Sequence, residues 1–218
     1  MGRLELVTGG ARSGKSAFAE RRAASLAAAR GTAAVVTYVA TAFASDEEME
    51  ARIAHHRARR PAAWGSIEAP MDLGAALADA RATADVVLVD CLAVWAANRL
   101  LALGDPEAAD GPAPEAWWRD VAALEAALVT ELDAALRLGD ALPNAARTGE
   151  ADVILVTNEV GLGLVPATPI GRAYRDLLGR VNQHLAGRAD AVHLVVAGFA
   201  LDLTSLATPI HQGEDRDR

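Results

Sequence analysis

The sequence predicts an α/β fold with a mainly parallel central sheet flanked by helices, and three observations support this prediction. Short apolar runs rich in β-branched residues alternate with helical patterns, which favours a parallel sheet covered on both faces. The first run leads directly into a Gly-rich loop that a helical pattern follows. The length of 218 residues suits one domain. We expect a single domain over residues 1–207 and a charged tail over residues 208–218. The short apolar runs, which we expect to form the strands, are five: residues 4–8, 33–40, 85–89, 152–157 and 191–197.

The Gly-rich loop after the first run reads Gly9-Gly10-Ala11-Arg12-Ser13-Gly14-Lys15-Ser16 and satisfies the pattern G-x-x-x-x-G-K-[ST]. In such a loop backbone N–H groups wrap a phosphate, and glycine permits a close approach that a Cβ would block. We expect Lys15 to reach the β- and γ-phosphates of a nucleotide and Ser16 to bind Mg²⁺. The helical pattern over residues 16–30 would point its N-terminal dipole at the same anion. The alternative is an ordinary Gly-rich turn.

Lysine usage supports the phosphate-binding interpretation of this loop. Lys15 is the only lysine among the 21 lysine and arginine residues of the chain. A compact ammonium is not interchangeable with a planar guanidinium in a tight phosphate cradle. A position that keeps lysine in an arginine-rich chain is therefore expected to need the ammonium.

Residues 45–60 carry a basic cluster on a predicted helix. Ser45 and Glu48 form a capping box that begins this helix, and Pro61 ends it by about Arg60. In an acidic protein such a cluster needs an anion, and one interpretation is a second site for nucleotide phosphates. The alternative is a solvated helix end whose cations complement the helix dipole. The basic residues of the last two turns are Arg52, His55, His56, Arg57, Arg59 and Arg60.

The two adjacent histidines of this helix lie on different faces. At about 100° per residue, His56 shares a face with Met49 and Ile53, whereas His55 falls with Arg52. We therefore expect His56 to point inward. By geometry alone, a histidine on an apolar face is more often a core residue than a nucleophile.

Two later strands end in carboxylates. Asp90 follows the run at 85–89 in the form of a Walker B element, which indicates a Mg²⁺ site or, alternatively, a cap of the next helix. Glu159 follows the run at 152–157 and could orient a nucleophilic hydroxyl or serve as a structural cap. Because the carboxyl ends of parallel strands meet at one edge, we expect four loops to converge there. These loops begin at Gly9, Thr41, Asp90 and Asn158.

The longest predicted helix runs from about Pro114 to Leu138. Its apolar residues recur at helical spacing, which indicates core or subunit contact. Surface loops are expected on either side of it, over residues 104–114 and 139–150. The apolar stripe consists of Trp117, Val121, Leu124, Leu128, Leu132 and Leu136.

Composition excludes several classes of partner. The net charge of −8 and the sequence pI of about 5.1 argue against nucleic acid or an anionic membrane surface as the main partner. The single cysteine, Cys91, excludes an internal disulfide and a Cys-rich metal site, which is consistent with a reducing, cytoplasmic location. We expect no integral membrane segment, because no apolar run approaches the roughly 18 residues that span a bilayer.

Taken together, the motifs resemble the bifunctional adenosylcobinamide kinase and adenosylcobinamide-phosphate guanylyltransferase family of cobalamin biosynthesis. The resemblance spans about residues 3–198 and is more specific than the Gly-rich loop alone. The matching segments are residues 9–16, Tyr38-Val39-Ala40-Thr41, Asp46-Glu47-Glu48-Met49, Arg52-Ile53, the His-His-Arg run to Arg60-Pro61, Val156-Thr157-Asn158-Glu159-Val160-Gly161, and Gly179-Arg180-Val181-Asn182-Gln183.

The resemblance implies a RecA-like P-loop fold and a homotrimer with nucleotide and corrinoid substrates. It implies phosphorylation of adenosylcobinamide with ATP or GTP, with Mg²⁺ as cofactor, and then transfer of GMP from GTP through a guanylyl-histidine. His56 matches the family's histidine, four residues after Arg52, and joins Lys15 as a catalytic candidate. The implied nucleotide-binding residues are Gly9, Gly10, Ala11, Arg12, Ser13, Gly14, Lys15, Ser16, Ala40, Thr41, Ala42, Arg57, Ala58, Arg59, Arg60, Glu68 and Asp90, and the metal ligands are Ser16 and Asp90.

Two other functions use the same loop. One is a different small-molecule P-loop kinase, which would use Lys15 and Asp90 without a covalent histidine. The other is a non-catalytic P-loop ATPase that recruits or moves a partner. Covalent labelling by GTP would separate both from the family's bifunctional chemistry.

Overall fold

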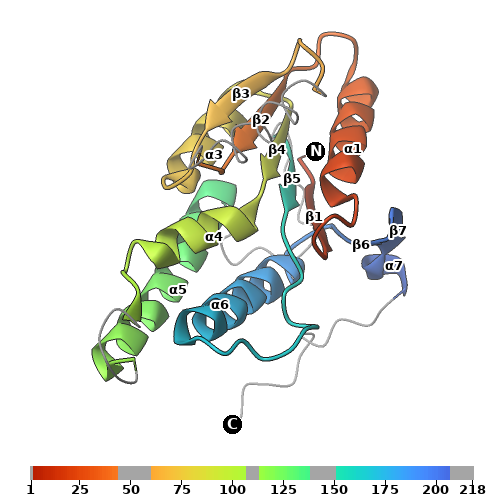
Figure 1. Ribbon diagram of the computed structural model, residues 1–218. Helices are drawn as coiled ribbons and strands as arrows, with labels where there is room; N and C mark the ends of the chain where they lie inside the picture. Colours follow the sequence, from red (N-terminus) through yellow and green to blue (C-terminus); the bar gives the residue numbers. More distant parts are fainter. Residues whose placement is uncertain (1, 44–59, 107–112, 138–150, 207–218) are drawn as a thin grey trace, which may run out of the picture.

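The computed structural model describes residues 2–43, 60–106, 113–137 and 151–206, which form a seven-stranded sheet with helices on both faces (Figure 1). Helix α1 covers one face, while α3, α4 and α6 lie on the other with α5 packed outside them. In chain order the elements are β1 (Leu4–Gly9), α1 (Lys15–Arg30), β2 (Val36–Ala40), β3 (Gly65–Glu68), α3 (Leu73–Thr83), β4 (Val86–Asp90), α4 (Leu92–Leu101), α5 (Glu115–Leu136), β5 (Asp152–Val156), α6 (Pro169–Ala186), β6 (Ala191–Val196), β7 (Phe199–Asp202) and α7 (Leu203–Leu206).

The strand order across the sheet is β3-β2-β4-β5-β1-β6-β7. Neighbouring strands are parallel except for the antiparallel pair β6 and β7. A single strand, β5, separates β1 from β4, which is the order typical of RecA-like P-loop folds. The predicted α/β fold with a mainly parallel sheet is confirmed.

The central strands are buried on both faces, which explains their continuous apolar sequences. Strand β5 is buried throughout, and β4 is buried up to its last residue, Asp90. The five predicted runs correspond to β1, β2, β4, β5 and β6, with ends that differ by up to three residues. Strands β3 and β7 were not predicted, because both are short and largely exposed edge strands, and β7 carries only three consecutive apolar residues, Phe199, Ala200 and Leu201.

Helix α5 occupies the range predicted for the longest helix to within two residues at each end. All six residues of its predicted apolar stripe are buried. Because the stripe packs toward α3, α4 and α6, it belongs to the core of this chain. The helix predicted over residues 45–60 falls almost wholly outside the described residues.

Candidate functional site

The carboxyl ends of the parallel strands meet at one edge of the sheet. Ala40 at the end of β2 lies beside Glu68 on one side and Asp90 on the other. Asp90 in turn lies beside Val156, the last residue of β5. The structure therefore brings the loops that follow these strands together with the Gly-rich loop after β1.

The Gly-rich loop contacts the neighbouring strand β6 so closely that residue 9 has no room for a side chain. A Cβ on Gly9 would lie 2.3 Å from the carbonyl oxygen of Val195. Gly14, with φ of 97°, is in the left-handed region immediately before α1. Lys15 Nζ donates a hydrogen bond of 3.1 Å to the Gly10 carbonyl oxygen. These contacts turn the chain sharply from strand to helix N-terminus, the arrangement that binds phosphate in P-loops.

The turn between β6 and β7 supports the loop from the other side. The backbone N–H of Gly198 donates a hydrogen bond of 2.8 Å to the carbonyl oxygen of Ser13. A Cβ on Gly14 would lie 3.5 Å from the Cα of Gly198. The loop is therefore fixed by its own strand, by β6 and by this turn.

Three polar groups at this edge lack partners within the part of the chain that the structure describes. The Thr8 and Ser13 hydroxyls and Asn158 Oδ1 are buried without a hydrogen bond. A buried polar atom without a partner is rare and costs free energy, unless a ligand or water bonds it. Ser13 lies in the Gly-rich loop and Asn158 follows β5, so these atoms indicate a polar ligand at this edge.

Asp90 has a specific neighbour in β2. The hydroxyl of Tyr38 donates a hydrogen bond of 2.9 Å to Asp90 Oδ2. Burial raises the pKa of Tyr38 above its usual range, and the negative charge of Asp90 adds to this shift. The guanidinium carbon of Arg60 lies 3.2 Å from the centre of the Tyr38 ring. Tyr38 was not among the predicted site residues. The sequence signal was a phenol among aliphatic β2 residues, since a buried hydroxyl needs a partner.

The residues present fit a Mg²⁺ ion that arrives with a nucleotide. Asp90 and Ser16 offer the hard oxygen ligands that Mg²⁺ prefers, and Mg²⁺ completes its shell with water and phosphate oxygens. Tyr38 bonds one Asp90 oxygen, Oδ2, which leaves Oδ1 for a ligand. Within the described ranges, no cluster of three or more His, Cys, Asp or Glu side chains could hold a metal without such a substrate.

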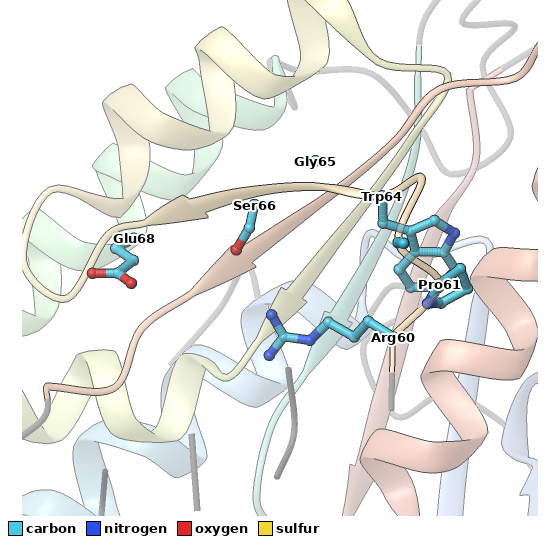
Figure 2. A pocket seen from close by; sticks show the side chains of 7 residues that line it. Arg60, Pro61, Trp64, Gly65, Ser66 and Glu68 are labelled. Carbon is cyan, nitrogen blue, oxygen red and sulfur yellow. The ribbon is translucent and has the colours of Figure 1, made fainter. Parts of the chain in front are cut away.

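A pocket of about 390 Å³ lies at the edge strand β3. Figure 2 shows Trp64 and Pro61 near the backbone end of Arg60, Ser66 on the side toward which its guanidinium extends, and Glu68 at the far end of the strand. Arg60 and Glu68, both predicted to contact nucleotide, thus line one cavity. His56, Arg57, Ala58 and Arg59 lie outside the described residues.

The side chains of Thr41 and Glu159 have structural contacts. The Thr41 hydroxyl is buried, donates to the Cys91 carbonyl oxygen at 2.7 Å and accepts from the Cys91 N–H at 2.8 Å. The backbone of Thr41 is bonded as well, because its N–H donates to the Asp90 carbonyl oxygen at 3.4 Å and its carbonyl oxygen accepts from Asn98 Nδ2 at 3.0 Å. Glu159 Oε1 accepts a hydrogen bond of 2.6 Å from the N–H of Gly161, as in a structural turn. Ala40 ends β2, and Ala42 follows it partly buried.

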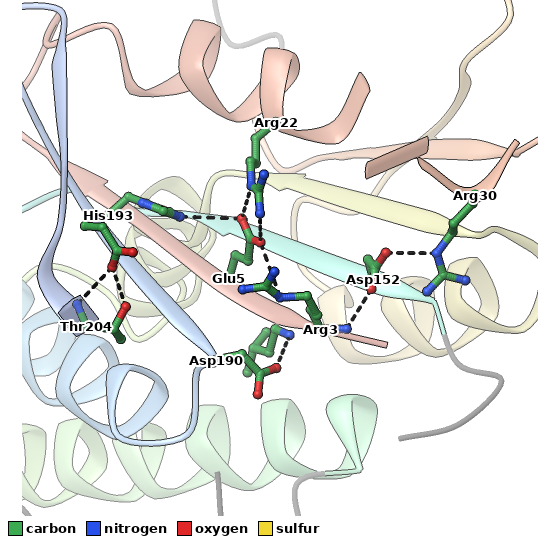
Figure 3. Close-up of polar contacts among 10 residues, drawn as sticks. Arg3, Glu5, Arg22, Arg30, Asp152, Asp190, His193 and Thr204 are labelled. Atoms are coloured by element: carbon green, nitrogen blue, oxygen red, sulfur yellow. Dashed lines mark hydrogen bonds and ion pairs between the residues drawn. The ribbon is translucent and has the colours of Figure 1, made fainter. Parts of the chain in front are cut away.

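A buried ionic cluster anchors β1, the strand that leads into the Gly-rich loop (Figure 3). Glu5 is fully buried and accepts two hydrogen bonds from Arg22 of α1, at 2.7 and 2.8 Å. His193 Nε2 lies 3.5 Å and Arg3 Nε 3.8 Å from the Glu5 carboxylate. Burial alone would raise the pKa of Glu5, but His193, Arg22 and the charge of Arg3 outweigh it and lower the pKa to about 2.

Comparison with known proteins gives matches along most of the chain. The family model described as "Cobinamide kinase / cobinamide phosphate guanyltransferase" matches residues 5–203. The bifunctional adenosylcobalamin biosynthesis protein CobU of Salmonella typhimurium is 41% identical over 198 residues, which are 91% of this chain and 98% of that protein. CobP of Pseudomonas aeruginosa, of the same description, is 41% identical over 199 residues, 91% and 96% of the two chains. CobU of Escherichia coli is 38% identical over 198 residues, 91% and 98% of the two chains.

We expect Gly9→Ala to lower the melting temperature by roughly 5 °C or more and to abolish nucleotide binding. The added Cβ would collide with the backbone of Val195, which cannot move aside without distorting β6. Gly10→Ala is the matched control for stability, because a Cβ there meets nothing within 4 Å. Thermal denaturation and binding of a fluorescent ATP analogue measure the two effects. Equal melting temperatures for the two variants would refute the close packing of residue 9.

We expect Glu5→Gln to lower the free energy of unfolding by about 3 kcal/mol at pH 7. The lowered pKa of Glu5 stabilises the folded state above pH 4.5, and this contribution is lost as the pH falls toward 2. The difference between wild type and variant should therefore shrink over that range. Urea denaturation at several pH values measures it, with Asp79→Asn on the exposed side of α3 as control. A difference independent of pH would contradict the ionic role of Glu5.

Proposed function

Because the chain belongs to the cobinamide kinase / cobinamide phosphate guanyltransferase family, we propose how its residues perform the two reactions of this bifunctional enzyme. The first is phosphorylation of adenosylcobinamide with ATP or GTP. The second transfers GMP from GTP to adenosylcobinamide-phosphate and gives adenosylcobinamide-GDP in cobalamin biosynthesis. The observation that carries this proposal is the family match over residues 5–203, with the Gly-rich loop and Asp90 at one edge of the sheet.

In the proposed kinase step, the backbone of residues 9–16 holds the nucleotide phosphates and Lys15 neutralises charge on the transferring group. The hydroxyl oxygen of the acceptor bonds to the γ-phosphorus, the bond from that phosphorus to the bridging oxygen breaks, and the hydroxyl loses its proton. The nucleoside diphosphate leaves. Ser16 and Asp90 would hold Mg²⁺, which when bound neutralises phosphate charge.

In the proposed guanylyl transfer, an imidazole nitrogen of His56 bonds to the α-phosphorus of GTP and pyrophosphate leaves. A phosphate oxygen of adenosylcobinamide-phosphate then bonds to that phosphorus, and the bond to His56 breaks. Imidazole suits both steps, because it is nucleophilic near pH 7 and leaves readily from a phosphoramidate. Arg57, Arg59 and Arg60 are proposed to stabilise the charge that develops on the phosphates. Support for this role comes from Arg60, which lines the pocket at β3 together with Glu68.

We propose that the enzyme acts as a homotrimer on small-molecule nucleotide and corrinoid substrates. The family resemblance supports the trimer, and light scattering at micromolar concentration tests it. An exclusively monomeric mass would contradict the proposal.

The helices within the described ranges include none with the length and apolar character needed to cross a membrane.

We expect His56→Asn to abolish covalent labelling of the protein by GTP carrying a radioactive α-phosphate. A phosphoramidate predicts a label that is labile to acid and stable to base. His55→Asn is the matched control and should keep the label, because the two histidines face different sides of the predicted helix. Label lost only in the His55 variant would assign the nucleophile to the other residue. Absence of label in wild type would remove the covalent step and favour a plain kinase.

The kinase step is tested by measuring transfer of the γ-phosphate to adenosylcobinamide in wild type, Lys15→Ala and His56→Asn. Lys15→Ala should reduce this transfer by about 100-fold or more at an unchanged melting temperature. His56→Asn should phosphorylate adenosylcobinamide like wild type. Loss of phosphorylation in both variants would mean that the two steps cannot be separated as proposed.

A further inference from the structure

Tyr38 contacts two charged residues of the site at once. Its hydroxyl donates to Asp90 Oδ2 at 2.9 Å, and its ring lies 3.2 Å from the guanidinium carbon of Arg60. Only 2% of the Tyr38 surface is exposed, so both contacts are made inside the protein. Asp90 is the last residue of β4, and only β5 separates β4 from β1, the strand that leads into the Gly-rich loop. Arg60 is the first residue of the segment that lines the pocket.

The sheet register explains why one side chain reaches Asp90. Tyr38 of β2 pairs with Leu88 of β4, and Asp90 lies two residues further along β4. Side chains two residues apart on a strand share a face, so the phenol and the carboxylate are diagonal neighbours on the same face. A phenylalanine would fill the same space beside Leu88, but it could not bond Asp90.

The two contacts fix different groups by different means. A hydroxyl that donates to a carboxylate makes a charge-assisted hydrogen bond, which is stronger than a neutral one and directional. Arg60 Nε is buried and has no hydrogen-bond partner in the described part of the chain. The Tyr38 ring therefore supplies the contact that holds the guanidinium plane, through a cation–π interaction.

We propose that Tyr38 is a positioning residue for both reactions: its hydroxyl orients Asp90 toward the metal-bound nucleotide, and its ring orients Arg60 toward the phosphates in guanylyl transfer. The inference rests on the proposed function for the roles of Asp90 and Arg60. The proposal predicts that the effects on Asp90 and on Arg60 can be separated by different substitutions of Tyr38. Loss of the hydroxyl disturbs the carboxylate alone, whereas loss of the ring disturbs the guanidinium as well.

The first test compares Tyr38→Phe with Tyr174→Phe, since the chain has two tyrosines. The Tyr174 hydroxyl donates to a backbone carbonyl, that of Ala93, at 3.1 Å and not to a site side chain. The readout is the Mg²⁺ concentration that gives half-maximal binding of a fluorescent ATP analogue, with melting temperature measured in parallel. Tyr38→Phe should raise this concentration by about tenfold, and Tyr174→Phe should leave it unchanged. The proposal would be overturned if Tyr38→Phe left the half-maximal Mg²⁺ concentration unchanged, or if both variants raised it equally.

The second test adds Tyr38→Leu and measures covalent GMP labelling at saturating Mg²⁺. Tyr38→Phe should label at the wild-type rate, because its ring still supports Arg60, and Tyr38→Leu should label more slowly. Equal rates in these two variants would overturn the role of the ring. If wild type takes up no label, the guanylyl-transfer proposal fails, while the Mg²⁺ dependence of nucleotide binding still decides the role of the hydroxyl.

Discussion

The close approach of the Gly-rich loop to strand β6 is the constraint on which the site depends. Residue 9 lies against the Val195 carbonyl with no space for a Cβ, so the chain can turn there only if that residue is glycine. The turn sets the position of the N-terminus of α1, and with it the anion-binding N–H groups. Glu5 and Arg22 then fix α1 to β1 from inside the protein, so that loop, strand and helix form one rigid unit.

The sequence predicted the centre of the sheet better than its edges. A strand buried on both faces must be apolar throughout, so β4 and β5 can be recognised without their neighbours. Strands β3 and β7 lie at the edges, where exposed and polar residues are tolerated, and they carry no such signal. The Glu5 carboxylate lies within an apolar run, and its partners come from α1 and β6. Such a cluster depends on tertiary contacts that no local pattern predicts.

The site shows the same division between local and tertiary information. The Gly-rich loop and Asp90 follow from patterns within a few residues, because phosphate and Mg²⁺ binding need fixed residue types at fixed spacing. Glu68 was predicted only through the family resemblance, whereas Arg60 also belonged to the predicted basic cluster, and the two residues line one pocket. Tyr38 could not be predicted as a partner of Asp90 without the register of β2 on β4. Thr41 shows that a residue in a family motif can direct its side chain into the backbone framework.

The hydrogen bond from Gly198 to Ser13 joins the last turn of the sheet to its first loop. During synthesis on a ribosome, the Gly-rich loop emerges long before strand β6 and this turn, which support it in the folded protein. A partial chain therefore lacks the contacts that shape the loop for phosphate. A nucleotide bound at this loop would therefore stabilise the fold only once β6 and β7 are in place, and it would not serve as a template for the segment that precedes them.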